Sequence, residues 1–254
     1  MLTHPTTDRL EALGFTGMAK ALDEQRRASD AFESLSFEER LGLLVDREAT
    51  ERDAKKLATR LRFAARRQAA CVEDIDMRSP RGIDKAVMAH LIDGGWIDRH
   101  ENLLITGPTG LGKSWIACAI GHKACRDDRR VMYHRIPRLF QALAIARGDG
   151  RHARVLKSIE RTQLLILDDW GLSVLNANER RDLLEILEDR QGRGSTIVTS
   201  QLPVDQWHEA IGDPTLADAI LDRLVHNAHR LNLSGESMRR KMSTTKLLDQ
   251  HSQD

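Results

Sequence analysis

The chain has 254 residues, of which 41% are hydrophobic and 30% are charged, and its formal net charge is +1. This composition can fill a core and excludes a disordered chain, and the length suits one domain of about 200 residues with an appendage. Because the sequence has no long apolar run, no signal-peptide pattern and only three cysteines, we expect a cytoplasmic protein that is not bound to a membrane.

The first part of the chain has the pattern of helices. Apolar residues from Leu10 to Leu22 recur at helical spacing, without strand-like alternation. Ser36 and Glu39 then stand three residues apart before a further apolar-periodic run, which is the pattern of a capping box at a helix start. The sequence therefore predicts a small all-helical module.

A basic stretch lies within this helical part. Between residues 47 and 67 the chain carries three acidic side chains and eight basic ones, namely Arg47, Arg52, Lys55, Lys56, Arg60, Arg62, Arg66 and Arg67. Such a run is most often the solvated face of a helix. It is also the pattern of a helix that lies on a nucleic-acid backbone, so both interpretations stay open at this point.

The pattern changes after a turn-rich linker at residues 72–82. We place the helical module at residues 1–75 and a second domain at residues 76–254. In this domain short apolar runs alternate with helical stretches, and the runs are 103–106, 131–133, 164–167, 196–199 and 230–233. The middle runs are apolar on both faces, as expected of parallel strands that helices cover, and the alternation with helical stretches predicts an α/β fold with a doubly wound parallel sheet.

A phosphate-binding loop follows the first predicted strand. Its residues are Gly107, Pro108, Thr109, Gly110, Leu111, Gly112, Lys113 and Ser114, and Trp115 follows in the next helix. The glycines let backbone N–H groups surround phosphate oxygens, Lys113 is expected on the β- and γ-phosphates, and the Ser114 hydroxyl on Mg²⁺. We predict that the run through Trp115 binds a nucleoside triphosphate, although the indole itself is expected to pack in the core.

Two aspartates end the third predicted strand. Asp168 and Asp169 follow four apolar residues, so the strand delivers them to the carboxyl edge of the sheet. Asp168 is expected to hold Mg²⁺ and Asp169 to orient the attacking water. The second carboxylate favours water as the phosphoryl acceptor, and hydrolysis is therefore the predicted reaction.

With these motifs the sequence resembles AAA+ P-loop ATPases and, among them, the IstB family of ATPase helpers of insertion-sequence transposition. The resemblance extends over nearly the whole chain, in the runs 35–41, 103–110, 164–171, 199–203, 207–215, 218–224 and 235–239. The last two runs are also similar in layout to helicase loaders of the DnaC type. A helicase loader is therefore the alternative function, and a nucleotide-gated binding module without turnover is a further one.

The resemblance implies roles for polar residues outside the two motifs. It places Ser200 or Gln201 in the sensor 1 region, Arg223 as an arginine finger for a neighbouring subunit, and Arg239 at sensor 2. The chain after Arg239 is short, so the resemblance implies at most a vestigial lid. Asp169 stands where most AAA+ proteins have a glutamate, which implies slow hydrolysis.

The resemblance also implies partners. It predicts ATP-driven self-assembly into a ring or spiral on duplex DNA, presentation of target DNA to a cognate transposase, stimulation of that transposase, and a reset by ATP hydrolysis. A second candidate DNA surface comprises Arg151, His152, Arg154, Lys157 and Arg161. Because only 4% of residues are aromatic, contacts to a duplex backbone are favoured over stacking on single strands.

Overall fold

The computed structural model describes residues 4–65 and 67–238. Contacts divide the chain into two units, Met1–Thr59 and Arg60–Asp254. The functional division at residues 75 and 76 stays a prediction. Within the described part, no helix has both the length and the apolar character that crossing a membrane requires.

The regular structure of the first unit is helical, as predicted. Its helices are α1 (Pro5–Ala12), α2 (Thr16–Arg27), α3 (Ser29–Phe32) and the larger part of α4 (Phe37–Ala64). The capping box is confirmed, because the Ser36 hydroxyl accepts from the backbone N–H of Glu39 and the Glu39 carboxylate accepts from that of Ser36 at 2.7 Å. These bonds satisfy donors that the first turn of α4 leaves unpaired.

Glu48 joins α2 to α4. Its buried carboxylate accepts the backbone N–H of Gly17 at 2.7 Å and of Met18 at 3.2 Å, and Arg52 donates to it at 2.6 Å. The bond from Arg52 lowers the pKa of Glu48 below its usual value, and the two backbone donors lower it further. The helices approach so closely at Gly17 that a Cβ atom there would lie 2.7 Å from the Cα of Glu48.

Replacement of Gly17 by alanine is expected to lower the free energy of unfolding of the first unit by about 1–3 kcal/mol, because the new methyl group meets backbone. Urea unfolding followed by far-UV circular dichroism measures this loss. All four tryptophans lie between residues 96 and 207, so tryptophan fluorescence reports the second unit separately. Gly42→Ala is the matched control, because a Cβ at this position in α4 meets nothing within 4 Å. Equal stability of the two variants would contradict the close approach.

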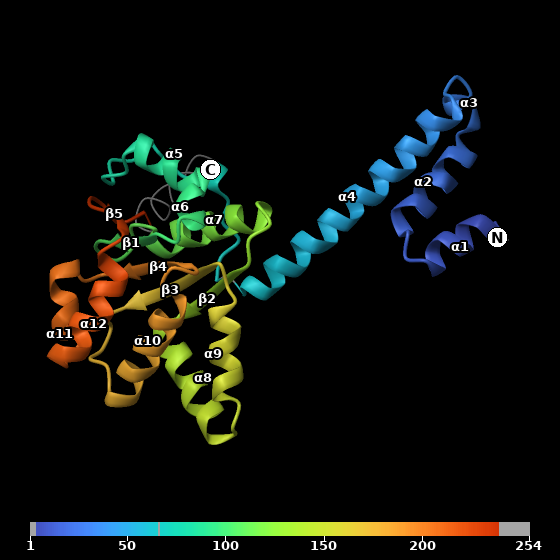
Figure 1. Cartoon of the computed structure of the whole chain (residues 1–254). Coiled ribbons are helices and arrows are strands. Elements are labelled where there is room, and N and C mark those ends of the chain that lie inside the picture. The colour runs from blue at the N-terminus through green and yellow to red at the C-terminus, as the bar shows by residue number, and fades with distance from the viewer. Residues whose placement is uncertain (1–3, 66, 239–254) are drawn as a thin grey trace, which may run out of the picture. The chain divides into compact units, whose positions relative to one another are not determined.

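The second unit contains a parallel sheet of five strands in the order β2-β3-β4-β1-β5 (Figure 1). The strands are β1 (Asn102–Thr106), β2 (Val131–Arg135), β3 (Leu164–Trp170), β4 (Ser195–Ser200) and β5 (Ala228–Asn232). The predicted α/β class with a parallel sheet is therefore confirmed. The central strands are apolar because helices cover both of their faces.

Helices cover the two faces of this sheet in two layers (Figure 1). On one face lie α5 (Lys85–Asp93), α6 (Gly95–Asp98) and α7 (Lys113–Arg126), preceded by the short helix η1 (Val72–Asp74). Cys118 and Cys125 of α7 are buried, as expected for small apolar side chains. The other layer comprises α8 (Ile136–Gly148), α9 (His152–Glu160), α10 (Ala177–Arg190), η2 (Val204–Gln206), α11 (Trp207–Ile211) and α12 (Pro214–Val225).

Because the strands are parallel, their carboxyl ends meet at one edge of the sheet. The phosphate-binding loop follows β1, Asp168 and Asp169 lie near the end of β3, and Ser200 ends β4. In open parallel sheets ligands bind at this edge. The fold therefore brings the predicted nucleotide motifs together although they are far apart in the sequence.

Candidate functional site

The phosphate-binding loop connects β1 to α7 and is held by chain from beyond β5. Gly107 has a φ of +137°, and a Cβ atom there would lie 2.2 Å from the carbonyl oxygen of Leu233. The backbone N–H of Leu233 donates to Thr106 at 2.8 Å, and that of Met238 donates to Gly110 at 2.9 Å. Only glycine fits at position 107, for both reasons.

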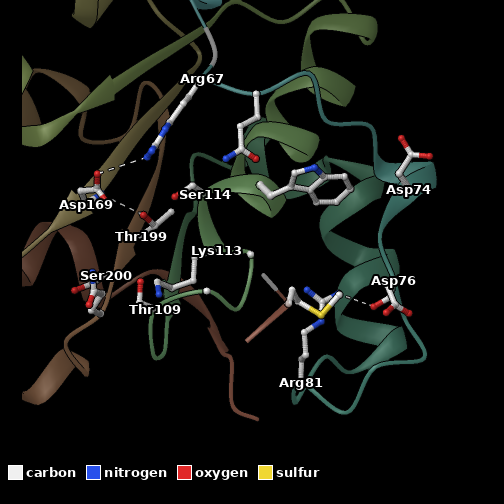
Figure 2. Close-up of a pocket in the computed structure, with 16 residues that line it drawn as sticks. Arg67, Asp74, Asp76, Arg81, Thr109, Lys113, Ser114, Asp169, Thr199 and Ser200 are labelled. Atoms are coloured by element: carbon white, nitrogen blue, oxygen red, sulfur yellow. Dashed lines mark hydrogen bonds and ion pairs between the residues drawn. The ribbon is translucent and has the colours of Figure 1, made fainter. Parts of the chain in front are cut away.

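A cavity of about 460 Å³ lies beside this loop (Figure 2). The predicted residues that line it are Thr109, Gly110, Gly112, Lys113, Ser114, Trp115, Asp169, Ser200 and Gln201. The prediction did not include the other lining residues, which are Arg67, Gln68, Asp74, Asp76, Arg81, Thr199 and Met238. The volume is in the range of small-molecule and cofactor sites.

Asp168 is fully buried at the base of the site. Its carboxylate accepts hydrogen bonds from three hydroxyl groups, those of Ser114 at 2.7 Å, Tyr133 at 2.5 Å and Thr199. Burial raises the pKa of the Tyr133 phenol, and the bond to Asp168 raises it further, so this hydroxyl stays a donor. A carboxylate next to a serine hydroxyl is an oxygen donor set that fits Mg²⁺.

Asp169 adopts a left-handed backbone conformation with a φ of +64°. The pairing of β3 with β4 is irregular between Leu167 and Trp170, and such an irregularity turns a side chain away from the sheet alternation. Arg135 Nε donates to Asp169 at 2.6 Å, and this bond raises the pKa of Arg135. Aspartate tolerates positive φ better than most residues, which gives a physical reason for aspartate at this position.

Thr199 connects the two aspartates. Its hydroxyl donates to Asp168 and accepts the backbone N–H of Asp169 at 3.3 Å. No sequence pattern predicts a role for this residue, although it lies next to the predicted sensor at the end of β4. Its position fixes Asp168 and the backbone of Asp169 relative to each other.

The two candidates for sensor 1 differ in their surroundings. Ser200 is buried, and its hydroxyl donates to the carbonyl oxygen of Trp170 at 2.9 Å and accepts the backbone N–H of Leu202 at 3.0 Å. Gln201 is exposed. Because the Ser200 hydroxyl already makes two bonds, the exposed amide of Gln201 is the side chain with greater freedom to meet a ligand in the cavity.

Two cations hold the loop in its present form. Lys113 Nζ donates to the carbonyl oxygens of Gly107 at 2.6 Å and Pro108 at 2.8 Å. Arg81 is buried and donates to the carbonyl oxygens of Leu111 at 3.0 Å and Asp76 at 2.6 Å. Burial lowers the pKa of Arg81, although the charge of Asp76 offsets part of this shift.

Other members of the predicted loop lie outside the cavity lining. Gly107, Pro108 and Leu111 do not line it, and the Leu111 side chain is fully buried. The expectation that the Trp115 indole packs in the core is wrong, because Trp115 is partly exposed and lines the cavity. It stands at the third position of α7, next to the loop, where the helix begins at the rim of the cavity.

Arg223 lies on α12, away from this cavity. It borders a second cavity, of about 470 Å³, together with Asn102 at the start of β1 and Thr196 near the start of β4. Its Nη2 donates to Glu188 at 2.8 Å. Arg223 is therefore near the amino edge of the strands, so a role as an arginine finger requires the nucleotide of another subunit. The sensor 2 candidate Arg239 lies outside the described residues.

The basic stretch from residue 47 to residue 67 does not form one continuous charged helix face. The helix α4 ends at Ala64, and Arg60 and Arg67 belong to the second unit. Arg60 Nη2 lies 2.6 Å from Asp128, while Arg47 and Arg52 pair with acidic residues of the first unit. Residues 47–59 contain four basic and three acidic side chains, so the excess of positive charge in this part of α4 is small.

The second candidate DNA surface comprises α9 and its two flanking residues, Arg151 and Arg161. His152 and Arg147 both contact Asp182, and Arg151 pairs with Asp149. Three further basic residues, Arg154, Lys157 and Arg161, are exposed and make no ion pair within residues 4–65 and 67–238. We call these three residues the α9 basic surface.

A cluster of metal-ligand residue types lies at the start of β1 and β5. His90, Glu101 and His229 place their ligand atoms within 4.8 Å of one another. Arg99 donates to Glu101 at 2.8 and 3.1 Å, and His229 contacts Glu101 at 2.7 Å. The bond from Arg99 and then that from His229 lower the pKa of Glu101 to about 2. An arginine therefore already supplies the cation for this carboxylate.

Comparison with known proteins gives a consistent result over most of the chain. Residues 8–246 match the family described as IstB-like ATP binding protein. The chain is 63% identical over 240 residues to an insertion sequence ATP-binding protein of Sinorhizobium fredii, which covers 94% of this chain and 98% of the relative. It is 51% identical over 205 residues to an insertion sequence ATP-binding protein of Pseudomonas fluorescens, and this match covers 80% of this chain and 88% of the relative.

Solved structures agree with the fold. The DnaC helicase loader superimposes with a TM-score of 0.56 at 16% identity and covers 67% of this chain and 100% of that chain. The replication initiator DnaA bound to AMPPCP and single-stranded DNA gives a TM-score of 0.57 at 15% identity, with 73% and 56% covered. At such low identity the similarity shows the fold alone, and it confirms the predicted AAA+ P-loop class.

Proposed function

Because this chain belongs to the IstB-like ATP binding protein family, we propose that it is a slow ATPase that assists the transposase of an insertion sequence. The observation that carries this proposal is the hydrogen bond of Ser114 to the buried Asp168, directly behind a cavity that Ser114 lines together with Lys113 and Asp169. This arrangement provides a metal site, a phosphate ligand and a second carboxylate at one place.

The chemistry follows from these groups. Lys113 and the loop N–H groups would hold the phosphates, and Ser114 and Asp168 would hold Mg²⁺, which supplies positive charge that neutralises the phosphates when bound. The water oxygen attacks the γ-phosphorus, the bond from this phosphorus to the ADP oxygen breaks, and the water proton passes to Asp169. Arg135 holds the Asp169 carboxylate in place through its 2.6 Å bond. The products are ADP and phosphate.

Self-assembly is supported by features of both units. Arg223 lies near the amino edge of the strands, so it does not reach the nucleotide cavity of its own subunit. In an oligomer it reaches the γ-phosphate of the neighbouring subunit. In the first unit, Phe37, Leu41 and Val45 follow one another at four-residue spacing on α4 and are 78%, 41% and 51% exposed. Exposed apolar residues on one helix face favour a protein partner, either the next subunit or the transposase.

Duplex DNA is the proposed substrate of the assembly. The α9 basic surface supplies cations for phosphate contacts, which carry no base readout, so binding is largely independent of sequence. The ATP-bound assembly presents target DNA to the cognate transposase and stimulates it, and hydrolysis then resets the assembly. The relatives are named for ATP binding and for insertion sequences, which supports a partner of this class.

The first experiment measures the ATPase rate and the sedimentation coefficient with and without long duplex DNA, at two salt concentrations. We expect duplex DNA to stimulate hydrolysis and to produce a large assembly that requires ATP and is weakened by salt. An unchanged rate without DNA-dependent assembly would contradict the proposal and favour the helicase loader. Nucleotide-dependent assembly without any turnover would favour the binding module.

Replacement of Arg223 by alanine is expected to abolish DNA-stimulated hydrolysis and assembly, because each subunit would lack the cation that reaches the nucleotide of its neighbour. The same two measurements test this expectation. Arg181→Ala is the matched control, since Arg181 is exposed on the adjacent helix α10. If the Arg223 variant assembles and turns over like the control, the site does not lie between subunits.

A further inference from the structure

The chain segment after α4 brings an additional cation to the two aspartates. Arg67 Nη1 lies 3.8 Å from Asp168 Oδ2 and 3.9 Å from Asp169 Oδ2, and Figure 2 shows its side chain directed at Asp169. Both distances exceed that of a hydrogen bond. Arg67 is therefore attracted to the aspartates without being fixed to them, in contrast to Arg135 at 2.6 Å.

Arg67 is not needed to hold the aspartates. Asp168 keeps three hydroxyl donors and Asp169 keeps Arg135 when Arg67 is absent. The Arg67 side chain is 42% exposed, so it contributes little to the core. A structural role alone does not account for an arginine at this position.

A loaded site changes the balance of charges around Arg67. A magnesium ion on Asp168 and Ser114 would place two positive charges next to a guanidinium that now lies within 4 Å of the same carboxylate. The terminal phosphate would bring negative charge into the same cavity, which Arg67 lines together with Lys113 and Ser114. A guanidinium binds phosphate through two parallel N–H bonds and keeps its charge at all physiological pH values.

We propose that Arg67 is a nucleotide ligand. When Mg-ATP binds, its side chain leaves Asp168 and Asp169 and binds the terminal phosphate of the nucleotide. ADP has no γ-phosphate, so with ADP Arg67 stays on the aspartates. Arg67 then makes the site selective for ATP over ADP. This inference rests on the proposed ATP binding, but not on DNA or on the transposase.

The test is a titration of the full chain with fluorescent analogues of ATP and ADP in the presence of Mg²⁺. Arg67→Ala is expected to weaken ATP binding about tenfold or more and to change ADP binding less than twofold. Arg67→Lys is expected to recover part of the difference, because lysine retains the charge but not the two-bond geometry. Arg62→Ala is the control, since Arg62 is exposed in the last turn of α4 and makes no ion pair within the described residues.

Each other outcome overturns the inference. Equal losses for ATP and ADP would place Arg67 on the inner phosphates or assign it a structural role. Tighter binding of both nucleotides would make Arg67 a competitor of magnesium, and unchanged binding would make it a bystander. Absence of ATP binding by the unmodified chain would contradict the proposed function itself, whereas ATP binding without DNA stimulation would leave the role of Arg67 intact.

Discussion

Replacement of Lys113 by alanine is expected to weaken ATP binding about 100-fold, because a charged bond to phosphate contributes about 1.5–3 kcal/mol and Lys113 reaches two phosphates. In the structure its ammonium donates to the Gly107 and Pro108 carbonyls, so the side chain already points along the loop. Titration with a fluorescent ATP analogue measures the change in affinity.

The control for this variant is Lys123→Ala on the same helix. Lys123 pairs with Asp127 at 2.6 Å near the far end of α7. It is expected to keep the ATP affinity of the unmodified chain, and a thermal unfolding curve of each variant shows that the fold is retained. Similar ATP affinity in the two variants would exclude the loop as the phosphate site.

Replacement of Asp169 by asparagine is expected to lower the hydrolysis rate about 100- to 10,000-fold with little change in ATP affinity, because an amide does not accept the water proton. Asparagine has the size of aspartate and tolerates the left-handed backbone at this position, and its oxygen can still accept from Arg135. Single-turnover hydrolysis of bound ATP measures the chemical step directly.

Asp189→Asn serves as the control, because Asp189 is exposed on α10 and away from the cavity lining. If the Asp169 variant keeps the hydrolysis rate of the unmodified chain, the role of base belongs to another group. A slow rate combined with an equal loss of ATP affinity would instead mean that Asp169 serves binding.

The sheet and both nucleotide motifs could be predicted because their signals are local. Short strand-like runs, of which the middle ones are apolar on both faces, alternate with helical stretches and so indicate parallel strands, and the loop from Gly107 to Ser114 has a spacing that few other structures require. The capping box at Ser36 and Glu39 is local in the same way. In each case the signal lies within one short run of residues.

The residues that surround Asp168 could not be predicted in this way. Tyr133 and Thr199 come from the neighbouring strands β2 and β4, so their contacts depend on the strand order, which no local pattern specifies. The sequence pattern predicts that Arg67 belongs to a basic helix, because the sequence does not show that α4 ends at Ala64. The left-handed conformation at Asp169 accompanies the irregular pairing of β3 with β4, so it also depends on a strand that is distant in sequence.

The strand order also determines when the site can form during synthesis. β1 pairs with β4 and β5, which are made last, whereas β2 and β3 pair with each other as soon as both have been made. In a nascent chain the strand before the phosphate-binding loop therefore stays unpaired until β4 (Ser195–Ser200) has been made, and such distant pairings form slowly. The nucleotide site is the last part of the sheet to be completed, so ATP stabilises the finished protein and not its folding intermediates.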